Sequence, residues 1–134
     1  MKIFEAEVEI DDLDNFLGRL DSIADSHNTT IQGFDARYVV SRRHIEEAVE
    51  KARRAFDRDE NVARELGMEI LLYAAGTRQI DVATEIGLDE GGNDVVFVVV
   101  GDDGAVDDAV QELEGIVGNS DVEEGVCGGI LALF

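Results

Sequence analysis

The chain has 134 residues, 45% of them hydrophobic, and its 31 acidic and 11 basic side chains give a formal net charge of −20. A domain of this length buries about two-thirds of its unfolded surface around one core. The longest charge-free apolar runs are far shorter than the roughly 20 residues of a membrane span, and the single cysteine excludes an internal disulfide. We therefore expect one cytoplasmic domain over residues 1–134, without an export signal.

The charge is unevenly distributed along the chain. Dense carboxylates with only two lysines favour a protein that works in molar salt, where screening shortens to roughly 3 Å and self-repulsion is weak. From Arg37 to Arg78 there are nine bases and eight acids, whereas the remainder holds two bases and 23 acids. The sequence thus predicts a halophilic protein with a locally neutral, arginine-rich middle. A pair of helices with many salt bridges on their surfaces would give the same ratio of basic to acidic residues.

The first elements are predicted from residue spacing. Residues 2–10 alternate as a half-buried strand does. Its apolar face is expected to hold Phe4, Ala6, Val8 and Ile10, and its polar face Lys2, Glu5, Glu7 and Glu9. Asp11 or Asp12 is placed to cap a helix. The core stripe of that helix comprises Leu13, Phe16, Leu17, Leu20, Ile23 and Ala24. A short second strand is expected in TTIQGF, residues 29–34.

Three helices are predicted next. Ser41 is placed to cap the first, whose apolar positions are Ile45, Ala48, Val49, Ala52 and Phe56. Glu47–Lys51 and Glu50–Arg54 have the i,i+4 spacing of ion pairs on that helix. The second helix is expected from Asn61 to Ala75, and its latter half is apolar nearly all round, which indicates burial on more than one side. Gly76 is a natural C′ residue, and Thr77 is placed to cap a short helix from Arg78 to Ile86.

The last third of the chain repeats the strand–helix pattern. DEGGND, residues 89–94, is predicted to be a loop, and VVFVVV after it a central strand covered on both faces. Asp102 or Asp103 begins a further helix, and GVCGGILALF at residues 125–134 is expected to be a final strand. The fold class predicted is mixed α/β (α+β), with one sheet of about four strands packed with about five helices.

Motifs for catalysis or metal binding are missing from the sequence. There is no phosphate-binding loop, no dinucleotide fingerprint and no zinc-ligand spacing, so we expect no catalytic residue, no metal and no cofactor. Ser41 and His44 with an acid would make a conceivable hydrolase set, but a serine used as an N-cap has its oxygen engaged by the backbone and is a poor nucleophile. A small-molecule-sensing regulatory domain with a pocket near residues 89–94 is an alternative.

The segment Glu69–Ile80, EILLYAAGTRQI, has the best pattern for a binding site. It contains Arg78, the last basic residue of the chain, where one predicted helix ends and the next begins. Helix starts offer free backbone N–H groups and a positive dipole end. Arg78 is suited to accept a phosphate or stack on a base, Gln79 to pair with a base edge, and Ile80 is expected in the core. An Arg78–Glu69 salt bridge that only orients two helices is the competing interpretation.

Two blocks of the sequence resemble a known family. SRRHIEEAVEKA, starting at Ser41, and MEILLYAAGTRQI, starting at Met68, are followed by a β–α unit. In this order they are similar to the small kinase-binding regulatory subunit of the KEOPS complex, the TPRKB-like family. The similarity covers roughly residues 30–100, and the acidic composition is what a haloarchaeal member would have.

The resemblance implies a non-enzymatic role. Members of that family bind the PRPK-type kinase/ATPase of KEOPS, enhance its activity and hold the single-stranded 3′ end of tRNA, so that another subunit makes threonylcarbamoyladenosine. Carried onto this chain, it implies tRNA contacts by Arg42, Arg43, His44, Glu69, Arg78, Gln79 and Ile80. The apolar terminal stretch around Leu131 and Leu133 is the kinase-binding surface that we expect, although a core strand would explain it as well.

Overall fold

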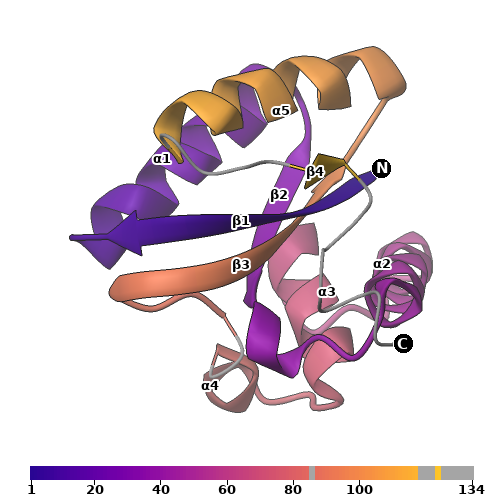
Figure 1. Ribbon diagram of the computed structural model, residues 1–134. Helices are drawn as coiled ribbons and strands as arrows, with labels where there is room; N and C mark the ends of the chain where they lie inside the picture. The colour runs from indigo at the N-terminus through magenta and orange to yellow at the C-terminus, as the bar shows by residue number, and fades with distance from the viewer. Residues whose placement is uncertain (85–86, 118–122, 125–134) are drawn as a thin grey trace.

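The computed structural model describes residues 1–84, 87–117 and 123–124 (Figure 1). Its elements, in chain order, are β1 (Lys2–Ile10), α1 (Leu13–Ser26), β2 (Thr30–Asp35), the 3₁₀ turn η1 (Ala36–Tyr38), α2 (Arg42–Asp57), α3 (Leu66–Ala75), α4 (Ile80–Ala83), β3 (Gly91–Val100), α5 (Asp103–Ile116) and β4 (Glu123–Glu124). Among these residues, no helix combines the length and apolarity that crossing a bilayer requires.

An antiparallel sheet forms the middle layer. Its strand order is β2-β3-β1-β4, and β3 pairs with β1 along Lys2↔Val99 to Ile10↔Gly91 and with β2 along Thr30↔Val100 to Asp35↔Val95. All six residues of 95–100 are buried, because helices cover both faces of this strand. The predicted fold class is confirmed. Three long strands make most of the sheet, and β4 has two residues.

Helices α1 and α5 cover one face of the sheet (Figure 1). Their buried stripes meet the apolar side of β1 and Val95, Phe97 and Val99 of β3. The Asp12 carboxylate accepts the amide hydrogen bond of Asn15 at 3.1 Å, which confirms one of the two predicted caps. Leu17 was expected in the core but is 39% exposed, because Phe16 and Leu20 already fill the inward positions of α1.

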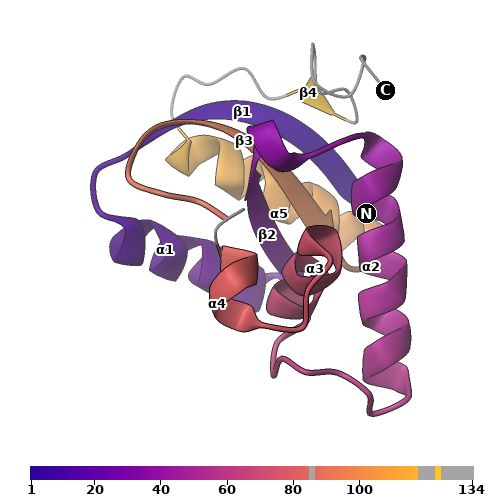
Figure 2. The same cartoon turned by 90° about the horizontal axis from the view of Figure 1, so that it is seen from below.

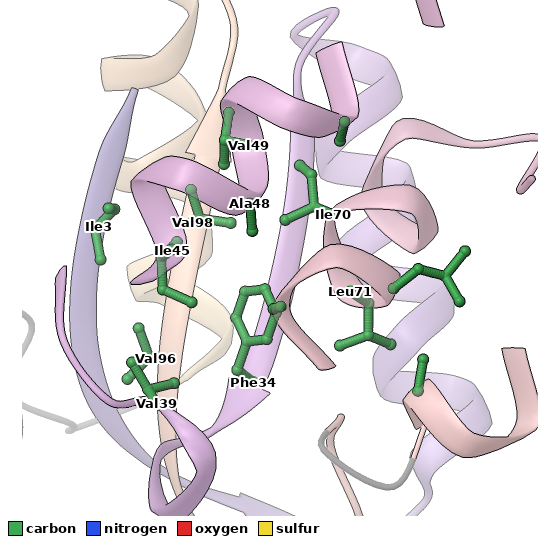
Figure 3. Close-up of a cluster of buried hydrophobic side chains, with 14 of the residues drawn as sticks. Ile3, Phe34, Val39, Ile45, Ala48, Val49, Ile70, Leu71, Val96 and Val98 are labelled. Carbon is green, nitrogen blue, oxygen red and sulfur yellow. The ribbon is translucent and has the colours of Figure 1, made fainter. Parts of the chain in front are cut away.

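Helices α2 and α3 cover the opposite face, and α4 lies beside α3 (Figure 2). Figure 3 shows Phe34 of β2 and Val96 and Val98 of β3 pointing toward α2 and α3. The expected division of β1 into an apolar and a polar face is wrong at Lys2, and it did not include Ile3. Ile3 is fully buried in this second cluster, and Lys2 lies on the other side of the sheet, where its ammonium group is 2.6 Å from Asp107 of α5.

Helix α2 follows the prediction closely. The Ser41 hydroxyl accepts the amide hydrogen bond of His44 at 3.1 Å, as a capping residue does. The Glu50–Arg54 ion pair is present at 2.6 Å, whereas Glu47 accepts a hydrogen bond from Arg43 at 3.0 Å. The expected side chains are buried on its inner face, with Phe56 only partly buried.

Three predicted boundaries are wrong. α3 begins at Leu66 instead of Asn61, and α4 (Ile80–Ala83) begins at Ile80 instead of Arg78, whereas its expected end at Ile86 lies outside the described residues. Residues 91–94 were expected in a loop but already belong to β3, where they pair with residues 7–10 of β1. The pocket-lining loop of the small-molecule-sensing alternative is therefore reduced to residues 89–90. The predicted strand at residues 125–134 lies outside the described residues.

Candidate functional site at the corner between α3 and α4

The corner, residues Glu69–Ile80, turns through a Schellman motif. The amide of Thr77 donates to the carbonyl of Leu72 at 3.1 Å, and the amide of Gly76 donates to that of Tyr73 at 3.2 Å. Gly76 has φ +69°, a left-handed conformation that glycine adopts without steric cost. Its predicted role as the C′ residue is confirmed. The Thr77 hydroxyl then accepts from the amide of Gln79 at 3.1 Å, which fixes the turn into α4.

Arg78, Gln79 and Ile80 are all exposed. Arg78 makes no ion pair with the residues that the structure describes. Ile80 was expected in the core, but it is 45% exposed. Ala83 takes the inward position of the short helix α4 and is fully buried, so the isoleucine at the start of α4 faces solvent.

Glu69 does not form the salt bridge considered as the alternative for Arg78. It is 2% exposed, and it is the only buried charged side chain among the described residues. Its Oε1 atom accepts the amide hydrogen bonds of Val62 at 3.0 Å and Ala63 at 2.8 Å. These bonds fold residues 61–65 across the start of α3, which explains why that helix does not begin at Asn61. Glu69 therefore positions the corner, and its Oε1 is already used inside the fold.

His44 ties the start of α2 to the end of α3. Its Nδ1 accepts the amide hydrogen bond of Val40 at 3.2 Å, and its Nε2 lies 2.7 Å from the carbonyl oxygen of Ala74. This pattern assigns the proton to Nε2, which donates to the carbonyl. Both ring nitrogens are engaged by backbone groups, and the Ser41 oxygen by the His44 amide, so these two residues form a structural link with neither side chain set up for catalysis.

Arg42 and Arg43 start α2 next to this link. Arg42 lies 3.5 Å from Glu46, and Arg43 donates to Glu47 at 3.0 Å. That bond is the main cause that raises the pKa of Arg43 and lowers the pKa of Glu47. Through the His44–Ala74 contact the structure brings the two sequence blocks together, but both arginines already have acidic neighbours. Arg78 is the cation that the corner leaves available.

A shallow hollow opens at the corner. Its lining residues are Val62, Glu69, Leu72, Tyr73, Thr77 and Arg78. Tyr73 was not among the predicted site residues, although it is 37% exposed on a helix that is otherwise mostly buried. A single aromatic residue followed by a Gly-Thr-Arg turn was the available sequence signal. The exposed Val62 was missed because the Glu69 contact that brings it here joins residues seven positions apart.

Large exposed hydrophobic side chains gather in the arginine-rich part of the chain. Seven are exposed among the described residues, and five of these fall between residues 38 and 80. They are Tyr38, Val40, Val62, Tyr73 and Ile80. The segment that is nearly neutral in charge thus also contains most of the large exposed hydrophobic side chains of the described residues.

Comparison with known families decides the classification. A family model described as "Kinase binding protein CGI-121" matches residues 12–126. The chain belongs to the CGI-121 family. This confirms the resemblance to the TPRKB-like kinase-binding subunits of KEOPS that the two sequence blocks indicated. A search of curated proteins gave no match.

As a CGI-121 protein, the chain is a kinase-binding protein by family. The corner lies within the matched range, at residues 69–80 of the 12–126 segment. Leu131 and Leu133, the predicted kinase-binding residues, lie outside the residues that the structure describes. Their role stays a prediction.

Proposed function

We propose that this CGI-121 protein is a non-catalytic accessory subunit of KEOPS in the cytoplasm of a halophilic archaeon. It binds and stimulates the PRPK-type kinase/ATPase, and it recruits tRNA by its single-stranded 3′ end for threonylcarbamoyladenosine modification. The observation that carries the RNA part is the joint exposure of Arg78, Gln79 and Ile80 beside Tyr73 at one turn of the chain.

The chemistry of the corner suits unpaired nucleotides. A chain of net charge −20 repels phosphate at long range, and molar salt removes most of the affinity that counterion release supplies. Stacking of bases on aromatic or guanidinium planes tolerates salt and contributes about 1–3 kcal/mol per base. Tyr73 and Arg78 offer such planes, Ile80 offers apolar contact, and the Gln79 amide can pair with a base edge. Duplex RNA would present none of these base faces.

The RNA part is tested by Arg78→Glu. We expect tRNA affinity to fall about ten-fold or more, because a stacked, hydrogen-bonding cation becomes an anion, while the melting temperature stays within a few degrees, because the side chain is exposed. Arg53→Glu is the matched control: it makes the same charge change at an exposed position on α2 and should leave affinity nearly unchanged. Filter binding in molar potassium chloride measures both.

Binding of trimmed tRNA distinguishes contacts to the 3′ end from contacts to the rest of the tRNA. Wild-type protein should bind tRNA lacking its 3′ terminus more weakly than intact tRNA. Equal binding of the two, or equal losses in Arg78→Glu and Arg53→Glu, would exclude the corner as the site for the 3′ end.

The kinase part has a separate test. We expect the kinase to co-purify with the full chain from high-salt lysate, and Leu131→Glu with Leu133→Glu to weaken that association through loss of apolar contact. Leu17→Glu is a control, because this leucine is an exposed apolar residue elsewhere on the molecule. Retention of the kinase by the double variant would move its binding surface away from the C-terminal stretch.

A further inference from the structure

A second hollow, of about 120 Å³, lies next to the corner. It is lined by Lys51, Arg54, Ala55, Arg58, Glu60 and Tyr73. Three cations and one acid surround it in a chain with almost three times as many acids as bases. We call it the basic hollow. Nothing in the family description assigns a role to it.

The basic hollow is built by the end of α2. Lys51, Arg54 and Arg58 are spaced by three and four residues, so they share one face of the helix. The helix ends in a Schellman motif, in which the amide of Glu60 donates to the carbonyl of Ala55 at 2.8 Å and the amide of Asp59 to that of Phe56 at 3.3 Å. Asp59 adopts φ +56° to make this turn. The motif holds the backbone on both sides of Arg58.

The three cations differ in what they already contact. Arg54 is bonded to Glu50 at 2.6 Å, and the charge of Lys51 helps to lower the pKa of Glu47, behind the larger effect of Arg43. Arg58 is exposed and has no ion pair with any residue that the structure describes. Its guanidinium is therefore the group with the most unused hydrogen-bonding capacity, and an anion is the partner that such a group takes.

Tyr73 connects the basic hollow to the corner. Tyr73 lines both hollows, together with Arg78 in the corner and with Arg58 in the basic hollow. A strand whose terminal base stacks at the corner therefore passes Tyr73 before it reaches Arg58. Bases and phosphates alternate along such a strand, so a surface that offers an aromatic ring flanked by two guanidinium groups matches it in order and in chemistry.

We propose that the basic hollow binds a phosphodiester group of the same single RNA strand, upstream of the nucleotides held at the corner. This rests on the proposed function, because the corner supplies the terminal nucleotides. Arg58 is the principal ligand, with Lys51 and Arg54 adding charge and Glu60 opposing it. The contact is direct and local, so it persists in molar salt, where screening removes longer-range attraction beyond roughly 3 Å.

The test compares two RNA probes on the full-length protein. The trinucleotide CCA occupies the corner only, whereas an octanucleotide ending in CCA also reaches the basic hollow. Arg58→Glu should weaken octanucleotide binding roughly ten-fold and leave trinucleotide binding unchanged. Arg53→Glu, two residues after Lys51 on α2 and outside the lining of the hollow, makes the same charge change and should affect neither probe.

Two further measurements test the phosphate contact: the salt dependence of octanucleotide binding, and a variant that removes the acid of the hollow instead of a cation. Removing one phosphate contact should make the slope of log K against log salt shallower by roughly 0.7 for the octanucleotide. Glu60→Gln removes the opposing acid and should tighten octanucleotide binding about two-fold, the reverse of the Arg58→Glu effect. Melting temperatures within a few degrees of wild type show that the variants fold, as expected for exposed side chains.

The possible results distinguish failure of this proposal from failure of the proposed function. If Arg58→Glu and Arg53→Glu weaken the octanucleotide equally, or if the trinucleotide is weakened as much as the octanucleotide, the basic hollow is not a phosphodiester site while the corner still binds RNA. If neither probe binds wild-type protein, the proposed function itself fails. A third result is that inorganic phosphate displaces the octanucleotide and raises the melting temperature of the protein as much as the octanucleotide does. That result would identify a site for free anions and overturn the proposal.

Discussion

Both faces of the sheet are packed against buried apolar side chains, but the helix pairs that cover them differ in charge. α1 and α5 together carry eight acids and one base, whereas α2 and α3 carry five of each. Both pairs bury a continuous cluster against the same three long strands. Stability therefore does not require the arginine-rich surface. Apart from the buried Glu69, the charged side chains of these four helices are partly or fully exposed, so the difference in charge lies mainly on the surface, where a binding function is exerted.

The same comparison explains where the candidate site lies. On the α1/α5 face a groove of about 560 Å³ has Asp14 and Glu112 on its lining and a single cation, Arg19. On the α2/α3 face the basic hollow and the corner adjoin through Tyr73 and bring together Arg58 and Arg78. An anionic partner would be repelled more by the first face than by the second, so the position proposed for the RNA site depends on the distribution of charge more than on the net charge.

The largest expected effect comes from the buried acid that shapes the corner. Glu69→Leu removes the acceptor of two amides, Val62 at 3.0 Å and Ala63 at 2.8 Å, and leaves these backbone donors without their partner. We expect a loss of about 3 kcal/mol in the free energy of unfolding, together with weaker RNA binding because the loop that carries Val62 moves. Urea denaturation at constant salt measures the first, and filter binding the second.

The matched control for that experiment is Glu50→Leu. Glu50 is exposed and contacts only Arg54 in an i,i+4 pair, so the change should cost less than about 0.5 kcal/mol. If Glu69→Leu proved as mild as this control, the carboxylate would not be holding the corner, and the structural role assigned to Glu69 would be wrong.

Most of the fold could be predicted from periodicity, and the errors have common physical causes. Helical spacing of apolar residues identified the inner faces of α1, α2 and α5, because burial against a sheet imposes that spacing directly. The start of α3 was wrong because the Glu69 carboxylate, a partner outside the local pattern, takes the amides of residues 62 and 63. Ile3 was missed because alternation assumes that only one face of a strand is covered, whereas at the start of β1 the second face is covered as well, although Glu7 and Glu9 farther along it are exposed.

The site was predictable in part for a different reason. The turn at Gly76, next to Arg78 and Gln79, could be located because a glycine followed by a capping residue indicates where one helix stops and the next starts, whereas the binding role of the two side chains stays a prediction. Ile80 was assigned to the core because an isoleucine is usually buried, but Ala83 takes the buried position of α4 and Ile80 is exposed. The basic hollow depends on residues 51–60 meeting Tyr73 across the fold, which no local pattern predicts.

A smaller effect is expected at the helix starts of the two faces. The Ser41 hydroxyl accepts an amide hydrogen bond at 3.1 Å at the start of α2, whereas Asp102, the N-cap residue of α5, makes no side-chain capping bond. Ser41→Ala should cost about 1 kcal/mol, and Asp102→Ala less than half of that, because only the charge–dipole interaction is lost. Urea denaturation of both variants measures the difference. A loss at Asp102 equal to that at Ser41 would contradict this assignment of caps.

The smallest effect concerns the titration of Asp35, at the end of β2 before the chain enters α2. The Arg37 guanidinium donates to both carboxylate oxygens of Asp35, at 2.6 and 3.1 Å, and this hydrogen bonding is the main cause that holds the pKa of Asp35 below its ordinary value. A carboxyl group with a lowered pKa in the folded state adds stability above its unfolded pKa, and this is lost as the pH falls through the folded value. Arg37 is exposed, so salt screening keeps the gain small.

Arg37→Ala should therefore raise the pKa of Asp35 toward its ordinary value, as followed by carboxyl carbon NMR, and should move the loss of this stabilisation to higher pH. Arg43→Ala is the control, because that guanidinium serves Glu47 on α2 and should leave the Asp35 titration unchanged. An Asp35 pKa that does not respond to Arg37→Ala would mean that the pair is too well screened to matter. In that case the Arg37–Asp35 pair would add no measurable stability, and the stability of this face would rest on its buried cluster.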